Sequence, residues 1–194
     1  MTLYDFKSAQ IPDGFFWLNE PKEFFFEQGL NLVTREKTDF WQTTHYGFKR
    51  DDGHCLLTKA RGNFTIKTQT EFSPESQYDQ CGLIARINSE NWIKCSVEYE
   101  NSELSRLGSV VTNGGFSDWA TQDISSDINS VTYKISKCEK DFTIEYSLDG
   151  KKWHQIRLAH LREFKDTIDI GLYACSPVGS DFKCKFRFIE ISQP

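Results

Sequence analysis

The sequence lacks features that mark several large classes of protein. No segment approaches the roughly 18 consecutive apolar residues of a membrane-spanning helix, and the N-terminus MTLYDFKSAQIPDGFFWLNE has neither the basic start nor the apolar run of an export signal. Positive charge is not in excess, since 28 acidic residues outnumber 23 lysines and arginines and give a formal net charge of −5. Such a chain does not hold nucleic acid by charge alone. We therefore predict a cytoplasmic protein without a membrane or nucleic-acid partner.

The six cysteines lack the Cys-x-x-Cys spacing of redox motifs and zinc sites. Because no export signal is visible, we expect reduced thiols rather than disulfides. Cys95 alternates with Ile93 and Val97, a pattern in which a thiol packs as a small hydrophobic group. The four histidines have no ligand-like spacing, and no glycine-rich loop precedes a helix. We therefore predict no metal and no cofactor. The cysteines are Cys55, Cys81, Cys95, Cys138, Cys175 and Cys184.

Aromatic residues are abundant, with 16 Phe, 7 Tyr and 5 Trp against a single Met. Aromatic side chains favour strands, and a period-two alternation of apolar and polar residues recurs along the chain. Turn signals such as Asp149-Gly150 separate the alternating segments. The pattern predicts an all-β sandwich or barrel. The predicted strands are residues 29–34, 54–59, 63–72, 82–88, 92–100, 109–113, 131–136, 142–147, 153–158, 168–175 and 182–191.

Nothing in the sequence divides the chain into parts. It contains no internal repeat or low-complexity tract, and 194 residues suit one domain. We predict a single domain over residues 1–194, with N-terminal strands within residues 1–37. Only residues 158–165 have a helical spacing, and they are short enough to form one turn beside a strand.

The residues of segment 92–99 alternate between apolar and mostly polar types, as expected for a strand with two different faces. Its odd-numbered residues Ile93, Cys95, Val97 and Tyr99 are apolar, and its even-numbered residues are Trp92, Lys94, Ser96 and Glu98. Since neighbouring residues of a strand point to opposite faces, the even-numbered side chains are predicted to emerge outside the hydrophobic core. Lys94 and Glu98 would lie about 13 Å apart along the strand and take their partners from adjacent strands.

The segment TDFWQTTHYGF, residues 38–48, is the strongest candidate for a pocket edge. Five of its polar residues, Asp39, Gln42, Thr43, Thr44 and His45, would each cost about 1–3 kcal/mol if buried without a partner. We expect Phe40 and Phe48 to point inward and Trp41, His45 and Tyr46 to lie at a pocket edge. The alternative is a plain structural segment.

Two further clusters, Tyr78-Asp79-Gln80 and Ser117-Asp118-Trp119, are predicted to lie in loops at strand ends, where functional residues often gather. We expect both clusters to meet the polar strand face in one shared hollow that binds a small ligand. Alternatively, their aromatic residues cap the core and their aspartates hold loop backbone. The predicted ligand-binding residues are Trp41, His45, Tyr46, Tyr78, Asp79, Gln80, Trp92, Lys94, Glu98, Asn113, Asp118 and Trp119.

Seven motifs in order, DFWQTTHYGF, DDGH, YDQCGLIARI, NWIKCSVEY, SVVTNGGFSDW, SLDG and IGLYACSP, resemble the regulation-of-enolase family of concanavalin A-like domains. The resemblance covers Thr38 to the C-terminus and departs at Cys81, where a small residue such as alanine is expected. It implies a jelly-roll sandwich of two antiparallel sheets, enolase as a candidate partner and carbon metabolism as the setting. It implies no particular reaction.

Three hypotheses about function follow. The first is a non-catalytic, lectin-like regulatory module that binds a carbohydrate-like molecule, a glycolytic intermediate or a protein. The second is a glycosidase, because Glu98 and Glu100 share a strand face and are similar to the acid pair of laminarinase-like enzymes, whose carboxyls lie about 5–5.5 Å apart in the retaining mechanism. The third is a protein-interaction scaffold without a pocket.

Overall fold

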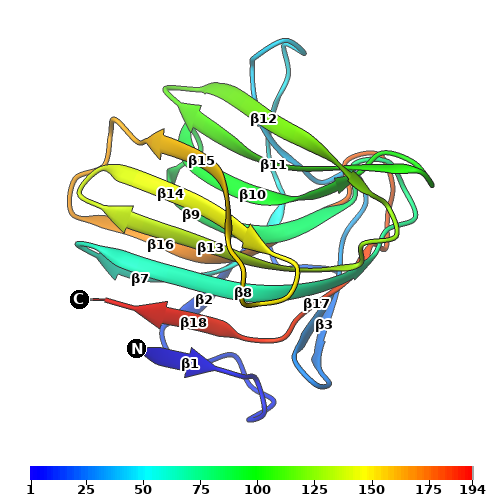
Figure 1. Cartoon of the computed structure of the whole chain (residues 1–194), viewed down its shortest axis with the longest axis horizontal. Coiled ribbons are helices and arrows are strands. Elements are labelled where there is room, and N and C mark those ends of the chain that lie inside the picture. Colours follow the sequence, from blue (N-terminus) through cyan, green and yellow to red (C-terminus); the bar gives the residue numbers. More distant parts are fainter. Residues whose placement is uncertain (194) are drawn as a thin grey trace.

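Two antiparallel sheets form a sandwich in the structure, which is a computed structural model that describes residues 1–193 (Figure 1). The seven-stranded sheet has the order β12 (Phe116–Ser125), β11 (Leu104–Asn113), β10 (Asn91–Tyr99), β9 (Gln80–Asn88), β16 (Thr167–Cys175), β7 (His54–Arg61) and β2 (Phe15–Leu18). The predicted all-β sandwich is confirmed.

The other large sheet has nine strands. Its order is β15 (His154–His160), β14 (Asp141–Ser147), β13 (Ser130–Cys138), β8 (Phe64–Ser73), β17 (Lys183–Phe186), β4 (Leu30–Val33) and β3 (Glu23–Phe26), while β18 (Ile189–Ser192) pairs with β8 and with β1 (Thr2–Tyr4). A separate hairpin consists of β5 (Phe40–Gln42) and β6 (Lys49–Asp51).

Each predicted strand overlaps an observed one, although 182–191 forms two strands, β17 and β18. Residues 1–37, for which N-terminal strands are predicted without bounds, contain β1, β2 and β3 as well as β4, and the sequence patterns missed β5, β6 and β12. The strand β12 was missed because it is an edge strand with several exposed polar residues, so its apolar alternation is weak. Residues 158–165 contain the end of β15 and a turn, and no helix.

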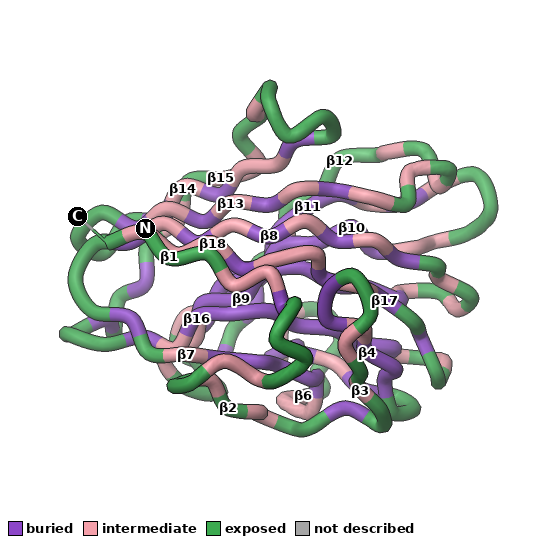
Figure 2. The backbone as a smooth tube through the Cα atoms, turned by 90° about the horizontal axis from the view of Figure 1, so that it is seen from below, coloured by how far each residue is buried: buried purple, intermediate pink, exposed green. Residues whose placement is uncertain are grey.

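The main core lies between the two sheets, and Figure 2 shows buried positions concentrated in the long strands and exposed ones in the connecting loops. The odd-numbered residues Ile93, Cys95 and Val97 of β10 point into this core, as the alternation predicts. Tyr133 reaches them from the opposite sheet, and its hydroxyl accepts a hydrogen bond of 2.8 Å from the Val97 amide. The sequence alternation therefore predicts correctly which side chains of β10 face the main core.

A second core covers the other side of the seven-stranded sheet. Phe40 of β5 packs there in edge-to-face contacts with Trp92, at 6.0 Å between ring centroids, and with Tyr173, at 6.4 Å. Gly53 permits this packing, because a Cβ atom at that position would lie 2.3 Å from the Phe40 ring. The prediction that the even-numbered residues of β10 lie outside the core is wrong for Trp92, which the β5–β6 hairpin buries in the second core, whereas Lys94 and Glu98 belong to neither core.

All six cysteines are free, as predicted, and five of them are buried. Burial raises the pKa of Cys95 to about 12, so this thiol stays protonated at neutral pH. Within residues 1–193 the structure contains no helix that is long and apolar enough to cross a membrane.

Replacing Phe40 with alanine should destabilise the protein by about 3–5 kcal/mol, because a large ring is removed from a closed core. Chemical denaturation followed by tryptophan fluorescence measures the change. The matched control is Phe25→Ala, whose ring is 46% exposed on β3. That variant should stay within about 0.5 kcal/mol of the wild type. Equal losses in both variants would contradict a second core under the hairpin.

Candidate functional site

A cavity of about 480 Å³ opens beside the β5–β6 hairpin, over one end of β9 and β10. It contains seven of the twelve predicted ligand-binding residues. The lining residues are Asp39, Trp41, Tyr46, Phe48, Arg50, Tyr78, Gln80, Lys94, Glu98, Trp119, Pro177 and Val178.

The Lys94 ammonium group forms the floor of this cavity, and its side chain is 3% exposed. Its Nζ donates a hydrogen bond of 2.6 Å to Gln80 Oε1. Two carboxylates lie slightly farther away, Asp39 Oδ1 at 3.7 Å and Glu98 Oε1 at 3.8 Å. Both distances exceed the normal range for a hydrogen bond, so Lys94 makes no close hydrogen bond to either carboxylate.

Strand register places these groups together. Lys94 and Glu98 share one face of β10, and Gln80 of β9 lies directly opposite Glu98. The expected separation of Lys94 and Glu98 applies to their backbones, whereas the long lysine side chain reaches along the strand to the carboxylate. Tyr173 OH donates a hydrogen bond of 3.1 Å to Gln80 Oε1, and Gln80 Nε2 donates to Tyr78 O. The Gln80 amide is thereby fixed with its oxygen toward Lys94.

Burial governs the protonation of the site. It raises the pKa of Glu98 to about 7, and the nearby Asp39 carboxylate adds to the rise, although the Lys94 ammonium opposes it. Burial lowers the pKa of Lys94, but the carboxylates of Glu98 and Asp39 outweigh it and hold that pKa above its usual value. Lys94 is therefore charged at neutral pH, where Glu98 is close to half ionised.

Aromatic rings form the cavity walls. Tyr46 packs edge-to-face on Trp41, with 5.4 Å between ring centroids, and stacks on Phe48 at 5.7 Å. The prediction that Phe48 points inward is wrong, because it is 44% exposed. The hairpin loop contains residues with positive φ, including His45 at 63°, and these break the strand alternation before Phe48.

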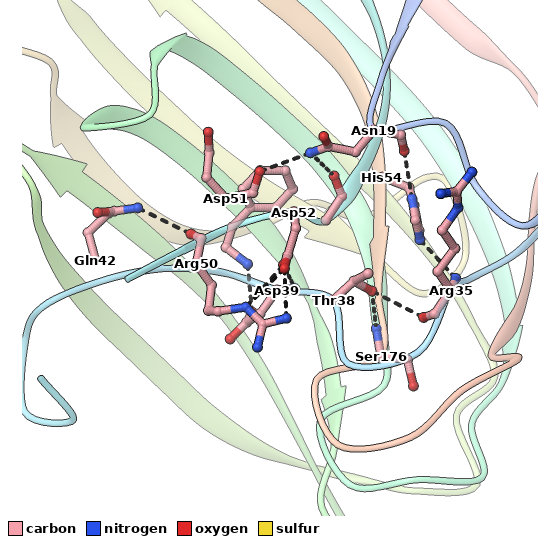
Figure 3. Close-up of polar contacts among 12 residues, drawn as sticks. Asn19, Arg35, Thr38, Asp39, Gln42, Arg50, Asp51, Asp52, His54 and Ser176 are labelled. Atoms are coloured by element: carbon pink, nitrogen blue, oxygen red, sulfur yellow. Dashed lines mark hydrogen bonds and ion pairs between the residues drawn. The ribbon is translucent and has the colours of Figure 1, made fainter. Parts of the chain in front are cut away.

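Backbone and side-chain hydrogen bonds fasten the hairpin to the sandwich (Figure 3). Asp52 Oδ1 accepts from the Asp39 amide at 2.8 Å, and Asp52 Oδ2 pairs with the Arg50 guanidinium at 2.7 Å. Asn19 Nδ2 donates to the carbonyl oxygens of Asp51 and Gly53. These bonds fix the position of Asp39, which precedes β5.

His54 connects the chain at Arg35, just before the hairpin, to Asn19 (Figure 3). Its Nε2 accepts a hydrogen bond of 2.9 Å from the Arg35 amide, and its Nδ1 lies 2.6 Å from Asn19 O. This arrangement requires a neutral ring with the proton on Nδ1, and burial lowers the pKa of His54 in agreement. His54 is thus a structural residue.

Of the five predicted ligand-binding residues that do not line the cavity, two have structural roles. Trp92 is 0% exposed in the second core, and its Nε1 donates to Ser89 O. Asp79 accepts hydrogen bonds from two loop amides on Oδ2 and from Ser176 Oγ on Oδ1, so it holds loop backbone. For Asp79 the structural alternative is correct. The prediction placed both residues wrongly, because sequence alternation does not show which loop covers a given face of a sheet.

The other predicted residues line a neighbouring, more open hollow of about 860 Å³, which we call the trough. It contains His45, Asn113 and Asp118 and shares Trp41, Tyr46 and Trp119 with the cavity. Asp118 and Trp119 lie within β12 rather than in a loop. The prediction of one shared hollow is therefore wrong, and the structure has two adjoining hollows. The trough is lined by Trp41, Thr44, His45, Tyr46, Val111, Asn113, Phe116, Ser117, Asp118, Trp119, Arg157, Leu158, Ala159, His160 and Arg162.

Five cavity residues were not predicted: Asp39, Phe48, Arg50, Pro177 and Val178. Asp39 belongs to the segment that the sequence singled out, and its place beside Trp41 was the available signal. Pro177 and Val178 come from the loop after β16, whose approach to β10 has no signal in the sequence.

The two glutamates of the glycosidase hypothesis have different surroundings. Glu98 lines the cavity, whereas Glu100 lines neither hollow. The Glu100 carboxylate accepts hydrogen bonds from Arg106 Nε at 3.0 Å and from Gln77 Nε2 at 2.9 Å. Among residues 1–193, no group of three or more His, Cys, Asp or Glu side chains is arranged to hold a metal ion.

Comparison with known proteins identifies close relatives. The chain is 35% identical over 189 residues to Regulation of enolase protein 1 of Saccharomyces cerevisiae, which covers 97% of this chain and 93% of that protein. A crystal structure described as a functionally unknown protein from Saccharomyces cerevisiae matches with a TM-score of 0.86 at 35% identity, over 93% of this chain and 97% of that one.

The fold also occurs in more distant proteins. A crystal structure of xylan beta-1,4-xylosidase from Bacillus halodurans C-125 matches 98% of this chain with a TM-score of 0.76 at 16% identity, and the chain covers 39% of that enzyme. This likeness shows the fold alone and agrees with the predicted jelly-roll sandwich. The predicted resemblance to the regulation-of-enolase family is confirmed by the 35% identity. Residues 17–194 match a family model, and the chain belongs to the family described as Protein of unknown function (DUF1349).

Proposed function

We propose that this chain is a non-catalytic, lectin-like module that binds a neutral polyhydroxylated molecule, a carbohydrate or a close analogue, in the cavity. The observation that carries this proposal is the Lys94 ammonium group 3.7 Å from Asp39 and 3.8 Å from Glu98 at the bottom of an aromatic cavity. A hydroxyl group that contacts both an ammonium and a neighbouring carboxylate accepts a hydrogen bond from the first and donates one to the second. The two pairs, Lys94 with Asp39 and Lys94 with Glu98, suit two neighbouring hydroxyls of a sugar.

The walls suit the same ligand. A sugar ring has apolar C–H faces between its hydroxyls, and aromatic rings such as Trp41, Tyr46 and Trp119 cover such faces well. No residue among 1–193 donates a hydrogen bond to the Glu98 carboxylate, so its acceptor capacity is available to a ligand.

The charge of the cavity disfavours phosphorylated ligands. Asp39 and Glu98 are both carboxylates, and Lys94 is shared between them. Arg50 also lines the cavity, but Asp52 already pairs with its guanidinium. A phosphate group would therefore meet negative charge without a free cation, which is unfavourable in a partly buried site.

A binding role fits better than glycoside hydrolysis by the predicted pair Glu98 and Glu100. Hydrolysis by two carboxyls requires that both face the scissile bond. Glu100 is directed to Arg106 and Gln77 instead of the cavity, which leaves Glu98 without its predicted partner.

The similarity to Regulation of enolase protein 1 supports carbon metabolism as the setting of this proposal, with enolase as a candidate partner. The six free cysteines support a cytoplasmic location, where thiols remain reduced.

A thermal-shift screen should separate neutral from phosphorylated sugars. Glucose and xylose should stabilise the protein, by about 2.7 kcal/mol at a hundredfold excess over Kd, whereas glucose 6-phosphate and fructose 1,6-bisphosphate should have little effect. Trp119→Ala should abolish the shift, and Trp153→Ala, which removes a tryptophan outside both hollows, should retain it. Stabilisation by the phosphorylated sugars alone would contradict the proposal.

Sugar affinity should rise with pH through about 7, because the ionised form of Glu98 is the better acceptor and its pKa is about 7. Glu98→Gln keeps the shape but removes the titrating group, so its affinity should be about tenfold lower at pH 8 and independent of pH. Isothermal titration calorimetry between pH 6 and pH 8 measures both effects. A pH profile that survives in Glu98→Gln would assign the dependence to another group.

The partner part of the proposal is tested with purified enolase. We expect co-sedimentation or pull-down of enolase with the wild-type protein at micromolar concentrations, in the presence or absence of sugar. If sedimentation velocity shows two independent species at tens of micromolar in both conditions, a direct contact is excluded.

A further inference from the structure

The trough adjoins the cavity along a shared aromatic wall. Trp41, Tyr46 and Trp119 line both hollows, so a ligand that fills the cavity and extends past these rings enters the trough. At its floor the cavity ends at Lys94, which is 2% exposed and whose Nζ lies over the buried Tyr173 ring. A ligand chain can therefore leave the cavity only on the side away from this floor.

Hydrogen bonds and an ion pair connect the strands at the floor of the trough. This floor lies where the edge strands β12 and β15 of the two sheets meet. Arg157 of β15 donates to Asp118 O at 3.0 Å and pairs with Asp118 Oδ1 at 2.7 Å. Asn113, the last residue of β11, bonds to the end of β15 and the residues after it, since its Nδ2 donates to His160 O and its Oδ1 accepts from the Arg162 amide. These polar groups are already paired within the protein.

Exposed apolar side chains gather around the two hollows. Five of the ten large apolar residues that are exposed within residues 1–193 line one of them. Scattered exposed apolar residues are common, but a contiguous group marks a binding surface. In the trough they are Phe116, 62% exposed, and Leu158, 65% exposed. At the cavity they are Tyr46, Phe48 and Val178.

We propose that the trough is a second subsite, which holds the next sugar of a short neutral oligosaccharide whose terminal sugar occupies the cavity. This inference rests on the proposed function and extends it to recognition of a glycan end. Phe116 and Leu158 contact the apolar face of the second sugar, and the shared aromatic residues lie beneath the linkage.

Calorimetry with sugars of increasing length tests the inference on the full chain. The probes are xylose, xylobiose and xylotriose, and glucose, cellobiose, laminaribiose and maltose. In at least one series the disaccharide should bind about tenfold more tightly than the monosaccharide. The double variant Phe116→Ser/Leu158→Ser should remove this gain and change monosaccharide affinity by less than about twofold.

Two matched phenylalanine variants serve as controls. Phe48→Ser removes an exposed ring that lines only the cavity, so it should weaken monosaccharide and disaccharide equally. Phe25→Ser removes a ring exposed to a similar degree on β3, outside both hollows, and should change neither affinity. Circular dichroism establishes that each variant is folded, and Phe116→Ser alone replaces the double variant if that one is not.

The outcomes distinguish the inference from the proposed function. If monosaccharides bind and no disaccharide binds more tightly, the second subsite is wrong and the cavity site stands. A trough variant that weakens monosaccharide and disaccharide equally also overturns the second subsite. If none of the seven sugars binds the folded protein, both are wrong.

Discussion

The burial of the Lys94 ammonium group is the constraint on which the candidate site depends. Removing a charge from water costs several kcal/mol, and the cost is offset only by well-placed partners. Here the partners come from three places in the chain: Glu98 on the same strand, Gln80 on the neighbouring strand, and Asp39 from the segment before the hairpin. The charged floor and the docking of the hairpin therefore stabilise each other.

The segment 38–48 combines core, anchor and pocket wall within eleven residues. Phe40 closes the second core, Asp39 completes the charged floor, and Trp41 and Tyr46 form aromatic walls. The usual division between a buried core and a functional surface does not apply to this part of the molecule. The face of β10 that sequence alternation marks as polar is buried, and its polar groups are paired with one another or open to a small cavity.

Strand patterning predicted the fold well, because alternation on β8, β9, β10 and β16 reflects which side faces the other sheet. It placed Lys94 and Glu98 near a common site for the same reason, whereas Gln80 was predicted as part of a loop cluster before the strand. It failed where a distant segment decides the environment. Trp92 was expected near a ligand, but the hairpin covers it, and Phe48 was expected inside, but residues with positive φ reverse its direction.

The central claim is that Glu98 is a buried carboxyl beside Lys94 whose free acceptor positions are filled by ligand hydroxyls. Carbon-13 NMR titration of the Glu98 side-chain carboxyl tests it most directly, without and with saturating neutral sugar. The account predicts a midpoint near 7 in the free protein and a lower midpoint when sugar is bound, because hydroxyl donors stabilise the ionised form. A midpoint close to the ordinary glutamate value of 4.5 that sugar does not move would contradict it.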